Sequence, residues 1–139
     1  AASDVYKRQV YDNGHIKPEW LWGSGILIAA STNVEVYDNT VTNNSDGISA
    51  IQQSRKNDDG PAVLRDLYVH DNIITMWFGQ SGVVQDVSDD SIFTDRNLVF
   101  EDNTYIGAGH EAFAWTNQDL TFDAWLEAGQ GAGSTRSDG

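Results

Sequence analysis

Three stretches of the chain alternate apolar and polar residues, and each of them ends in the dipeptide Asp-Asn. They are VEVYDN at residues 34–39, LYVHDN at 67–72 and LVFEDN at 98–103. Since successive side chains of a β-strand point to opposite faces, this alternation predicts strands with one buried and one outward face. The final residues Asn39, Asn72 and Asn103 are 33 and 31 residues apart. Such spacing is typical of a solenoid or another repeat architecture.

Alignment on these Asn residues separates inward from outward columns. The inward columns contain Val34, Leu67 and Leu98, followed two positions later by Val36, Val69 and Phe100. The outward columns contain Glu35, Tyr68 and Val99, followed two positions later by Tyr37, His70 and Glu101. A fourth copy, VYDN at residues 10–13, adds Val10 to the inward set and Asn13 to the Asn column.

Each repeat contains further short strands. A second apolar segment follows each Asn, as in TVTNN, IITMW and TYIGA, and a third follows a glycine in GILIAA, GISAIQ and GVVQDV, and less clearly Glu111 in EAFAW. No helical pattern separates these segments, so we expect two or three strands per repeat and parallel pairing between successive repeats. Coils stacked about 4.8 Å apart bury one continuous interior. The sequence therefore predicts an all-β solenoid.

The repeated Asp-Asn is explained by the bend between the first and second strands. We expect Asn13, Asn39, Asn72 and Asn103 to adopt the left-handed conformation that Asn tolerates. A carboxamide that points inward has donors and an acceptor, so stacked Asn side chains can form a structural ladder. The preceding Asp points to solvent, where it either caps the turn or takes part in chemistry.

The segments NVEVYDNTVTNNSDGISAIQ and LRDLYVHDNIITM resemble coils of the pectin-lyase-like superfamily. The resemblance covers residues 10–116 and implies a right-handed parallel β-helix. It also implies a polysaccharide-interacting protein, either a polysaccharide lyase or glycoside hydrolase or a non-catalytic adhesin or structural module. FAWTNQDLTFDAWLEAGQ is similar to the ending of many secreted bacterial members. The resemblance therefore predicts a C-terminal fragment of a secreted or cell-surface protein, with further coils upstream.

The two ends of the chain depart from the repeat. AASDVYKRQ at residues 1–9 resembles a non-native linker, and Arg8 occupies a position where an apolar residue is due. Residues 117–129 are expected to form a helical cap, with Thr121 as N-cap and Gly129 at its end. We expect the cap to bury Phe122, Trp125 and Leu126. Residues 130–139 are rich in Gly and Ser and predict a flexible tail.

Composition restricts the partners. The chain contains eight Lys and Arg residues and 21 Asp and Glu residues, so its formal net charge is −13. This negative charge argues against nucleic acid or an anionic membrane as the main partner. The chain contains no Cys, so disulfides, thiolate zinc sites and a Cys nucleophile are excluded. No apolar run is long enough to span a membrane, and no spacing of metal ligands is recognisable. The excess of carboxylates leaves Ca²⁺ as an open hypothesis.

The candidate substrate-binding residues come from two loops. Trp20 and Trp22, in HIKPEWLWGSG, have rings on which sugar faces can stack, although they can equally cover an upstream coil. In IQQSRKNDDG, Gln52, Gln53 and Lys56 are candidates for substrate binding, and Arg55 is a candidate catalytic base. The alternative for this second loop is a solvated charged segment.

Two further catalytic candidates lie in later coils. In QDVSDDS, Gln85 is a binding candidate and Asp86 a catalytic one, expected beside Gln52 or Gln53 of the neighbouring coil. Asp89 and Asp90 are expected to form an ordinary turn. His70 is the third catalytic candidate, with pairing to its coil neighbours as the alternative. The hypothesis places Gln53, Arg55, Asp86 and His70 on one substrate-facing surface.

Overall fold

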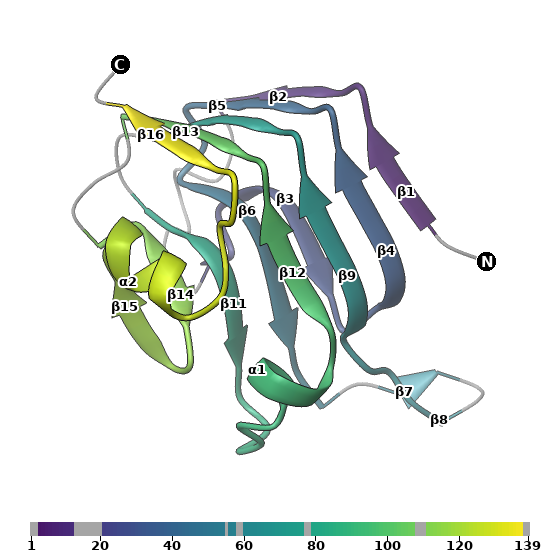
Figure 1. Ribbon diagram of the computed structural model, residues 1–139. Coiled ribbons are helices and arrows are strands. Elements are labelled where there is room, and N and C mark those ends of the chain that lie inside the picture. Colours follow the sequence, from purple (N-terminus) through teal and green to yellow (C-terminus); the bar gives the residue numbers. More distant parts are fainter. Residues whose placement is uncertain are drawn as a thin grey trace.

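The chain forms a right-handed parallel β-helix in which three sheets surround one core (Figure 1). The structure is a computed structural model that describes residues 3–12, 21–54, 56–57, 60–76, 79–107 and 111–137. We call the three sheets A, B and C. Each coil contributes a strand to sheet A, then to sheet B, then to sheet C, and the next coil begins with the adjacent strand of sheet A. The predicted fold class is confirmed.

Consecutive strands of one sheet come from consecutive coils. Sheet A contains β1 (Ser3–Tyr6), β4 (Thr32–Tyr37), β9 (Arg65–His70) and β12 (Leu98–Glu101). Sheet B contains β2 (Gln9–Tyr11), β5 (Thr40–Thr42), β10 (Ile73–Thr75), β13 (Thr104–Ile106) and β16 (Thr135–Ser137). Sheet C contains β3 (Ser24–Ala29), β6 (Asp46–Gln52), β11 (Ser81–Gln85), β14 (Phe113–Trp115) and the antiparallel β15 (Gln118–Leu120). A two-stranded hairpin, β7 (Lys56–Asn57) and β8 (Gly60–Pro61), projects between β6 and β9.

The in-register pairing of sheet A confirms the predicted columns. Val36 lies opposite Val69, which lies opposite Phe100, and all three are buried. The same holds for the column formed by Val34, Leu67 and Leu98. Because equivalent side chains lie directly over one another, the apolar column forms a continuous core and the polar columns form continuous outward rows.

The first coil corrects the alignment of VYDN at residues 10–13. In sheet A, Val5 lies opposite Val36. In sheet B, Val10 lies opposite Val41. The stretch therefore belongs to sheet B, and Arg8 occupies the place that Asn39 holds one coil later. Asn13 lies outside the described residues. The non-native origin of residues 1–9 stays a prediction, although Ser3–Tyr6 form β1 and pair with β4.

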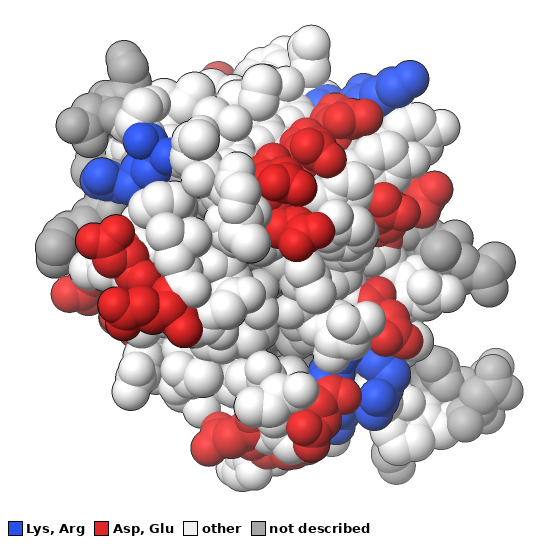
Figure 2. All heavy atoms as spheres, in the orientation of Figure 1, with Lys and Arg blue, Asp and Glu red and all other residues white. Residues whose placement is uncertain are grey.

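The chain turns from sheet A into sheet B at a column of left-handed residues. These are Asp38, Asp71 and Asp102, with φ angles of 55°, 54° and 54°. The sequence predicted that Asn would adopt this conformation, but the turn is made one residue earlier, because the Asn side chain has to point inward. Asp also tolerates the left-handed region. Figure 2 shows acidic side chains in a line over the ends of β4, β9 and β12, where this corner lies.

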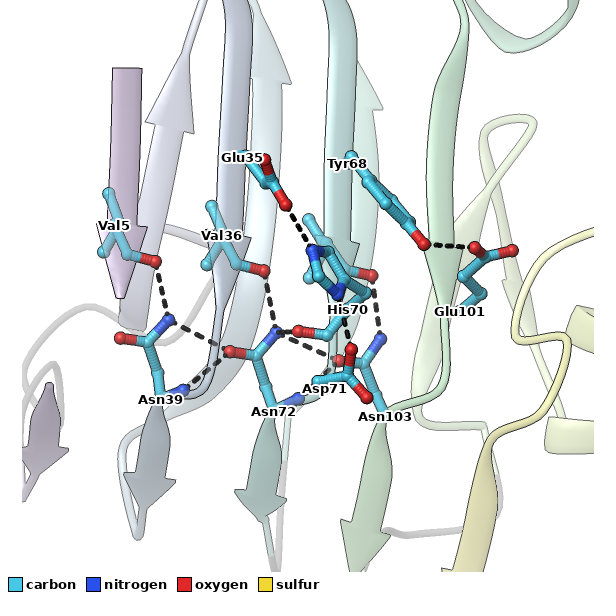
Figure 3. Close-up of polar contacts among 11 residues, drawn as sticks. Val5, Glu35, Val36, Asn39, Tyr68, His70, Asp71, Asn72, Glu101 and Asn103 are labelled. Atoms are coloured by element: carbon cyan, nitrogen blue, oxygen red, sulfur yellow. Dashed lines mark hydrogen bonds and ion pairs between the residues drawn. The ribbon is translucent and has the colours of Figure 1, made fainter. Parts of the chain in front are cut away.

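The predicted ladder of buried Asn side chains is confirmed for Asn39, Asn72 and Asn103 (Figure 3). Asn39 Nδ2 donates to Asn72 Oδ1 at 3.0 Å, and Asn72 Nδ2 donates to Asn103 Oδ1 at 3.0 Å. Each of these oxygens also accepts from the backbone N–H of the preceding Asn. Every Nδ2 in addition donates to a carbonyl of the previous coil, that of Val5, Val36 or Val69.

The ladder ends on groups other than Asn. At the N-terminal end the backbone N–H of Arg8 donates to Asn39 Oδ1 at 3.1 Å. At the other end Asn103 N donates to Ser134 Oγ at 3.0 Å. A coil can thus continue the ladder with a backbone donor or a hydroxyl acceptor, which explains why the first and last coils lack the repeat's Asn.

Residues 130–137 belong to the solenoid, whereas the sequence predicted a flexible tail over residues 130–139. Gln130 is buried, its Oε1 accepts from Phe100 N at 2.8 Å, and its Nε2 donates to Leu98 O at 2.8 Å. β16 then pairs in parallel with β13. The amide of Gln130 satisfies strand groups as another strand would, and composition alone does not reveal this.

The predicted helical cap is present as α2 (Phe122–Glu127), and Thr121 Oγ1 accepts from Ala124 N at its start. Trp125 is fully buried, stacks on Phe113 and meets Phe100 edge-on. Leu126 was expected to be buried but is 39% exposed. A second short helix, α1 (Ile92–Asp95), was not predicted, and it contributes Ile92 and Phe93 to the core.

Replacing Asn72 by Ala is expected to lower the free energy of unfolding by about 3 kcal/mol. The substitution removes the acceptor of Asn39 and the donor to Val36 O, and so leaves buried polar groups unpaired. Thr40→Ala, at an exposed position beside the ladder, is the control and should change stability by less than about 0.5 kcal/mol. Urea denaturation followed by circular dichroism measures both. Equal stabilities of the two variants would contradict a ladder that stabilises the fold.

Trp125→Ala should cost about 3 to 5 kcal/mol, because it removes a large ring from the end of the core. The neighbouring Leu126→Ala, on the exposed side of the same helix, should cost less than about 1 kcal/mol. Thermal and urea unfolding of both variants provide the measurement. A loss for Leu126→Ala as large as that for Trp125→Ala would show that α2 does not cap the core through Trp125.

Candidate functional site

The outer face of sheet A carries an aromatic row that follows the coil axis. Tyr6 stacks on Tyr37 with ring centroids 5.1 Å apart, and Tyr37 stacks on His70 at 5.3 Å. Tyr68, in the neighbouring outward column, stacks on His70 at 4.0 Å. The rings lie in a row because β1, β4 and β9 pair in register and present equivalent positions to the same face.

Carboxylates hold two of these rings, those of His70 and Tyr68, in place (Figure 3). His70 Nε2 lies 2.5 Å from Glu35 Oε2, one coil before, and His70 Nδ1 lies 2.6 Å from Asp71 Oδ2. The Tyr68 hydroxyl donates to Glu101, one coil after. Three successive coils therefore contribute to one connected set of side chains, which we call the sheet A cluster: Glu35, Tyr37, Tyr68, His70, Asp71 and Glu101.

The electrostatics of the cluster favour the protonated forms of His70 and Tyr68. Partial burial lowers the pKa of His70, but hydrogen bonds to Asp71 and Glu35 outweigh burial and raise this pKa above its usual value. The hydrogen bond to Glu101, together with burial, raises the pKa of Tyr68 to about 12. His70 and Tyr68 thus keep their protons to higher pH than the free side chains do. His70 is accordingly suited to donating hydrogen bonds rather than to abstracting a proton.

A groove of about 640 Å³ lies beside the cluster on the same face of sheet A. Its lining comes from β4, β9, β12 and the residues that precede these strands: Asn33, Val34, Glu35, Asp66, Leu67, Tyr68, Asn97, Val99 and Glu101. Asn33, Asp66 and Asn97 form one edge, and all three are left-handed, with φ angles of 65°, 55° and 55°. Tyr68 is the aromatic side chain of the groove, and Glu35 and Glu101 belong both to the groove and to the cluster.

The structure places the predicted residues of sheet C at the ends of β6 and β11. Gln85 lies opposite Gln52, and Asp86 N donates to Gln52 O, so Asp86 lies in the next coil at the level of Gln53, as expected. Gln52 itself is buried, and its Oε1 accepts from Leu64 N at 2.6 Å. The side chain of Gln52 therefore holds the loop before β9, whereas the sequence suggested that it faces a substrate.

Most of the remaining contacts at this end of sheet C are structural. Gln85 Oε1 accepts from Val87 N at 2.8 Å. Asp89 accepts from Ser91 N and Oγ and pairs with Arg96 at 3.3 Å, which confirms the expected turn. Hydrogen bonds from Ser91 lower the pKa of Asp89.

The other predicted binding residues come from loops. Trp22 is 40% exposed. Arg55, Trp20 and the side chain of Lys56 lie outside the described residues.

The structure does not bring His70 together with Asp86 and Gln53. His70 ends β9 in sheet A, whereas β6 and β11 of sheet C run in the opposite direction and end at the other edge of the solenoid (Figure 1). His70 instead meets Glu35, Tyr68 and Tyr37. This cluster could have been predicted from the sequence, because most of its members occupy the two outward columns of the aligned repeats.

In the described part of the chain, no group of three His, Asp or Glu side chains is arranged to hold a metal ion. Ca²⁺ binding stays a prediction. None of the helices among the described residues is long and apolar enough to cross a membrane. No family model, curated protein sequence or solved structure matches this chain.

His70 is expected to titrate above 6.5, its ordinary pKa. Because the folded-state pKa exceeds the unfolded one, this proton contributes stability fully below pH 6.5 and loses it as pH rises through the folded pKa. His70→Gln should therefore destabilise most below pH 6.5 and progressively less above it. NMR titration of the imidazole and unfolding curves across this range test the prediction. A pKa at or below 6.5, or a stability difference that grows with pH, would contradict it.

Proposed function

We propose that the outer face of sheet A binds polysaccharide, and that the chain is part of a secreted carbohydrate-active β-helix protein. The observation that carries this proposal is the continuous row of Tyr6, Tyr37 and His70 beside a groove that contains Tyr68. Because the stacked rings cover one another's faces, the apolar C–H surface of a sugar would pack across the row of ring edges, while nearby polar groups fix its orientation.

The repeat suits an extended polymer. A solenoid presents equivalent positions at regular intervals, and such surfaces bind elongated partners. Here the aromatic row and the groove both run across β4 and β9, so successive sugar units would meet similar side chains. The carboxylates of Glu35 and Glu101 supply acceptors for sugar hydroxyls along the same direction.

Membership of the pectin-lyase-like superfamily is part of this proposal. It is supported by the parallel coils, the buried Asn ladder and the capping helix α2. Between the two enzyme classes suggested by that resemblance, the cluster favours a glycoside hydrolase. Glu35 and Glu101 are two carboxylates that line one groove, which is the arrangement that acid–base hydrolysis uses, whereas both ring nitrogens of His70 already face the carboxylates of Glu35 and Asp71, so neither is free to take a substrate proton in β-elimination.

One observation favours a non-catalytic adhesin or structural module instead. Glu35 is bound to His70, and Glu101 accepts from Tyr68, so both carboxylates already have partners within the protein. In an adhesin these pairs would serve only to keep the aromatic row rigid. The two candidates share the same binding surface and differ in whether a carboxylate leaves its partner when the glycan binds.

Tyr68→Ala and Tyr37→Ala are expected to weaken glycan binding about three- to tenfold, the fold-change that corresponds to loss of one aromatic contact. Tyr11→Ala is the matched control, because Tyr11 is an exposed Tyr on β2 of sheet B, 64% accessible to solvent. Affinity electrophoresis against a panel of plant, algal and microbial polysaccharides provides the measurement. Equal losses for all three variants, or no binding to any member, would contradict the proposed surface.

The same panel distinguishes enzyme from adhesin. A hydrolase releases reducing ends and loses this activity in Glu101→Gln, a lyase releases ultraviolet-absorbing unsaturated ends, and an adhesin binds without product. The assay uses the chain both alone and within its full-length protein. Unsaturated products from the unaltered chain would contradict the preference for hydrolysis.

A further inference from the structure

The groove on sheet A is lined by charges of a single sign. Its charged side chains are those of Glu35, Asp66 and Glu101, and none of the Lys or Arg residues that the structure describes lines it. Asp66 is exposed and accepts from Asn97 Nδ2 at 3.2 Å. Tyr68 and the apolar residues of the lining provide a hydrophobic surface between these carboxylates. The groove therefore combines a surface on which a sugar ring can pack with several anionic acceptors.

Lys7 Nζ lies 5.9 Å from the centroid of the Tyr6 ring, in the first coil and outside the groove lining, and the other cations around this face are engaged by other groups. The imidazole of His70 is flanked by Glu35 and Asp71. Their two negative charges outnumber the single positive charge that the imidazole can carry. Arg96 pairs with Asp89. The Arg65 guanidinium donates to Asp95 O at 3.5 Å. In the described part of the groove nothing would neutralise the carboxylate of a uronic acid, and burying that charge beside like charges is unfavourable.

We propose that this groove selects glycans with positively charged amino sugars, such as β-1,4-linked glucosamine, over polyuronates. The inference rests on the proposed glycan-binding role of sheet A and specifies the class of glycan. An ammonium group has three N–H donors and no acceptor, so it can donate charge-assisted hydrogen bonds to Glu35, Asp66 or Glu101 while its ring packs on Tyr68. N-acetylation removes this charge and keeps the ring.

The test compares three oligosaccharides of equal length by isothermal titration calorimetry: glucosamine, N-acetylglucosamine and galacturonic acid. We expect glucosamine to bind most tightly and galacturonic acid least, and we expect the difference to shrink at high salt, where charges are screened. Glu35→Gln and Glu101→Gln should each weaken glucosamine binding about three- to tenfold. The same variants should change N-acetylglucosamine binding less than about twofold.

Glu127→Gln is the matched control, because it removes the same charge from an exposed position on α2. An equal effect of Glu127→Gln would mean that net charge attracts the amino sugar, and would overturn the inference. Galacturonate binding that equals or exceeds glucosamine binding would also overturn it. If binding depends on Tyr68 but not on the carboxylates, the proposed function stands and only the amino-sugar preference fails. If Tyr68→Ala has no effect on any of the three ligands, both proposals fail.

Discussion

The hydrogen-bonded stacking of Asn39, Asn72 and Asn103 is the constraint on which the rest of the structure depends. A parallel strand pair has no tight turn to set its register, and slippage by one residue would exchange the buried and outward sets of side chains. Asn39 and Asn72 each bond both the next Asn and a carbonyl of the previous coil, so each connects three coils at one corner. These contacts keep the apolar columns aligned with each other.

The proposed binding surface is a direct consequence of that register. Since the inward columns coincide, the outward columns coincide as well, and side chains 31 to 35 residues apart in sequence come within hydrogen-bonding distance. Glu35 reaches His70, Tyr68 reaches Glu101, and the rings of Tyr37 and His70 stack. The cluster is thus assembled from one to three residues of each of three coils, and the residues of a single coil do not form a recognisable motif.

Much of the fold was predictable from the sequence, because the period of two and the repeat of 31 to 33 residues both follow from the packing of the core. The ends were not. Arg8 continues the ladder through its backbone N–H, and Ser134 ends it through a hydroxyl, so neither coil needs the Asn that marks the repeat. Gln130 replaces strand contacts with a side-chain amide. A backbone N–H that bonds the ladder, or a side-chain amide that takes the place of a strand, leaves no signature in the pattern of residues.

The site was less predictable, since the repeat shows which residues face outward but not which sheet they occupy. His70 was grouped with Asp86, although the two belong to different sheets.

The most direct test of the stacked corner is hydrogen exchange of side-chain carboxamides, observed by NMR. The Nδ2 protons of Asn39, Asn72 and Asn103 should exchange far more slowly than those of the exposed Asn97 and Asn117. Equal exchange rates for the two groups would contradict the ladder and the register that depends on it.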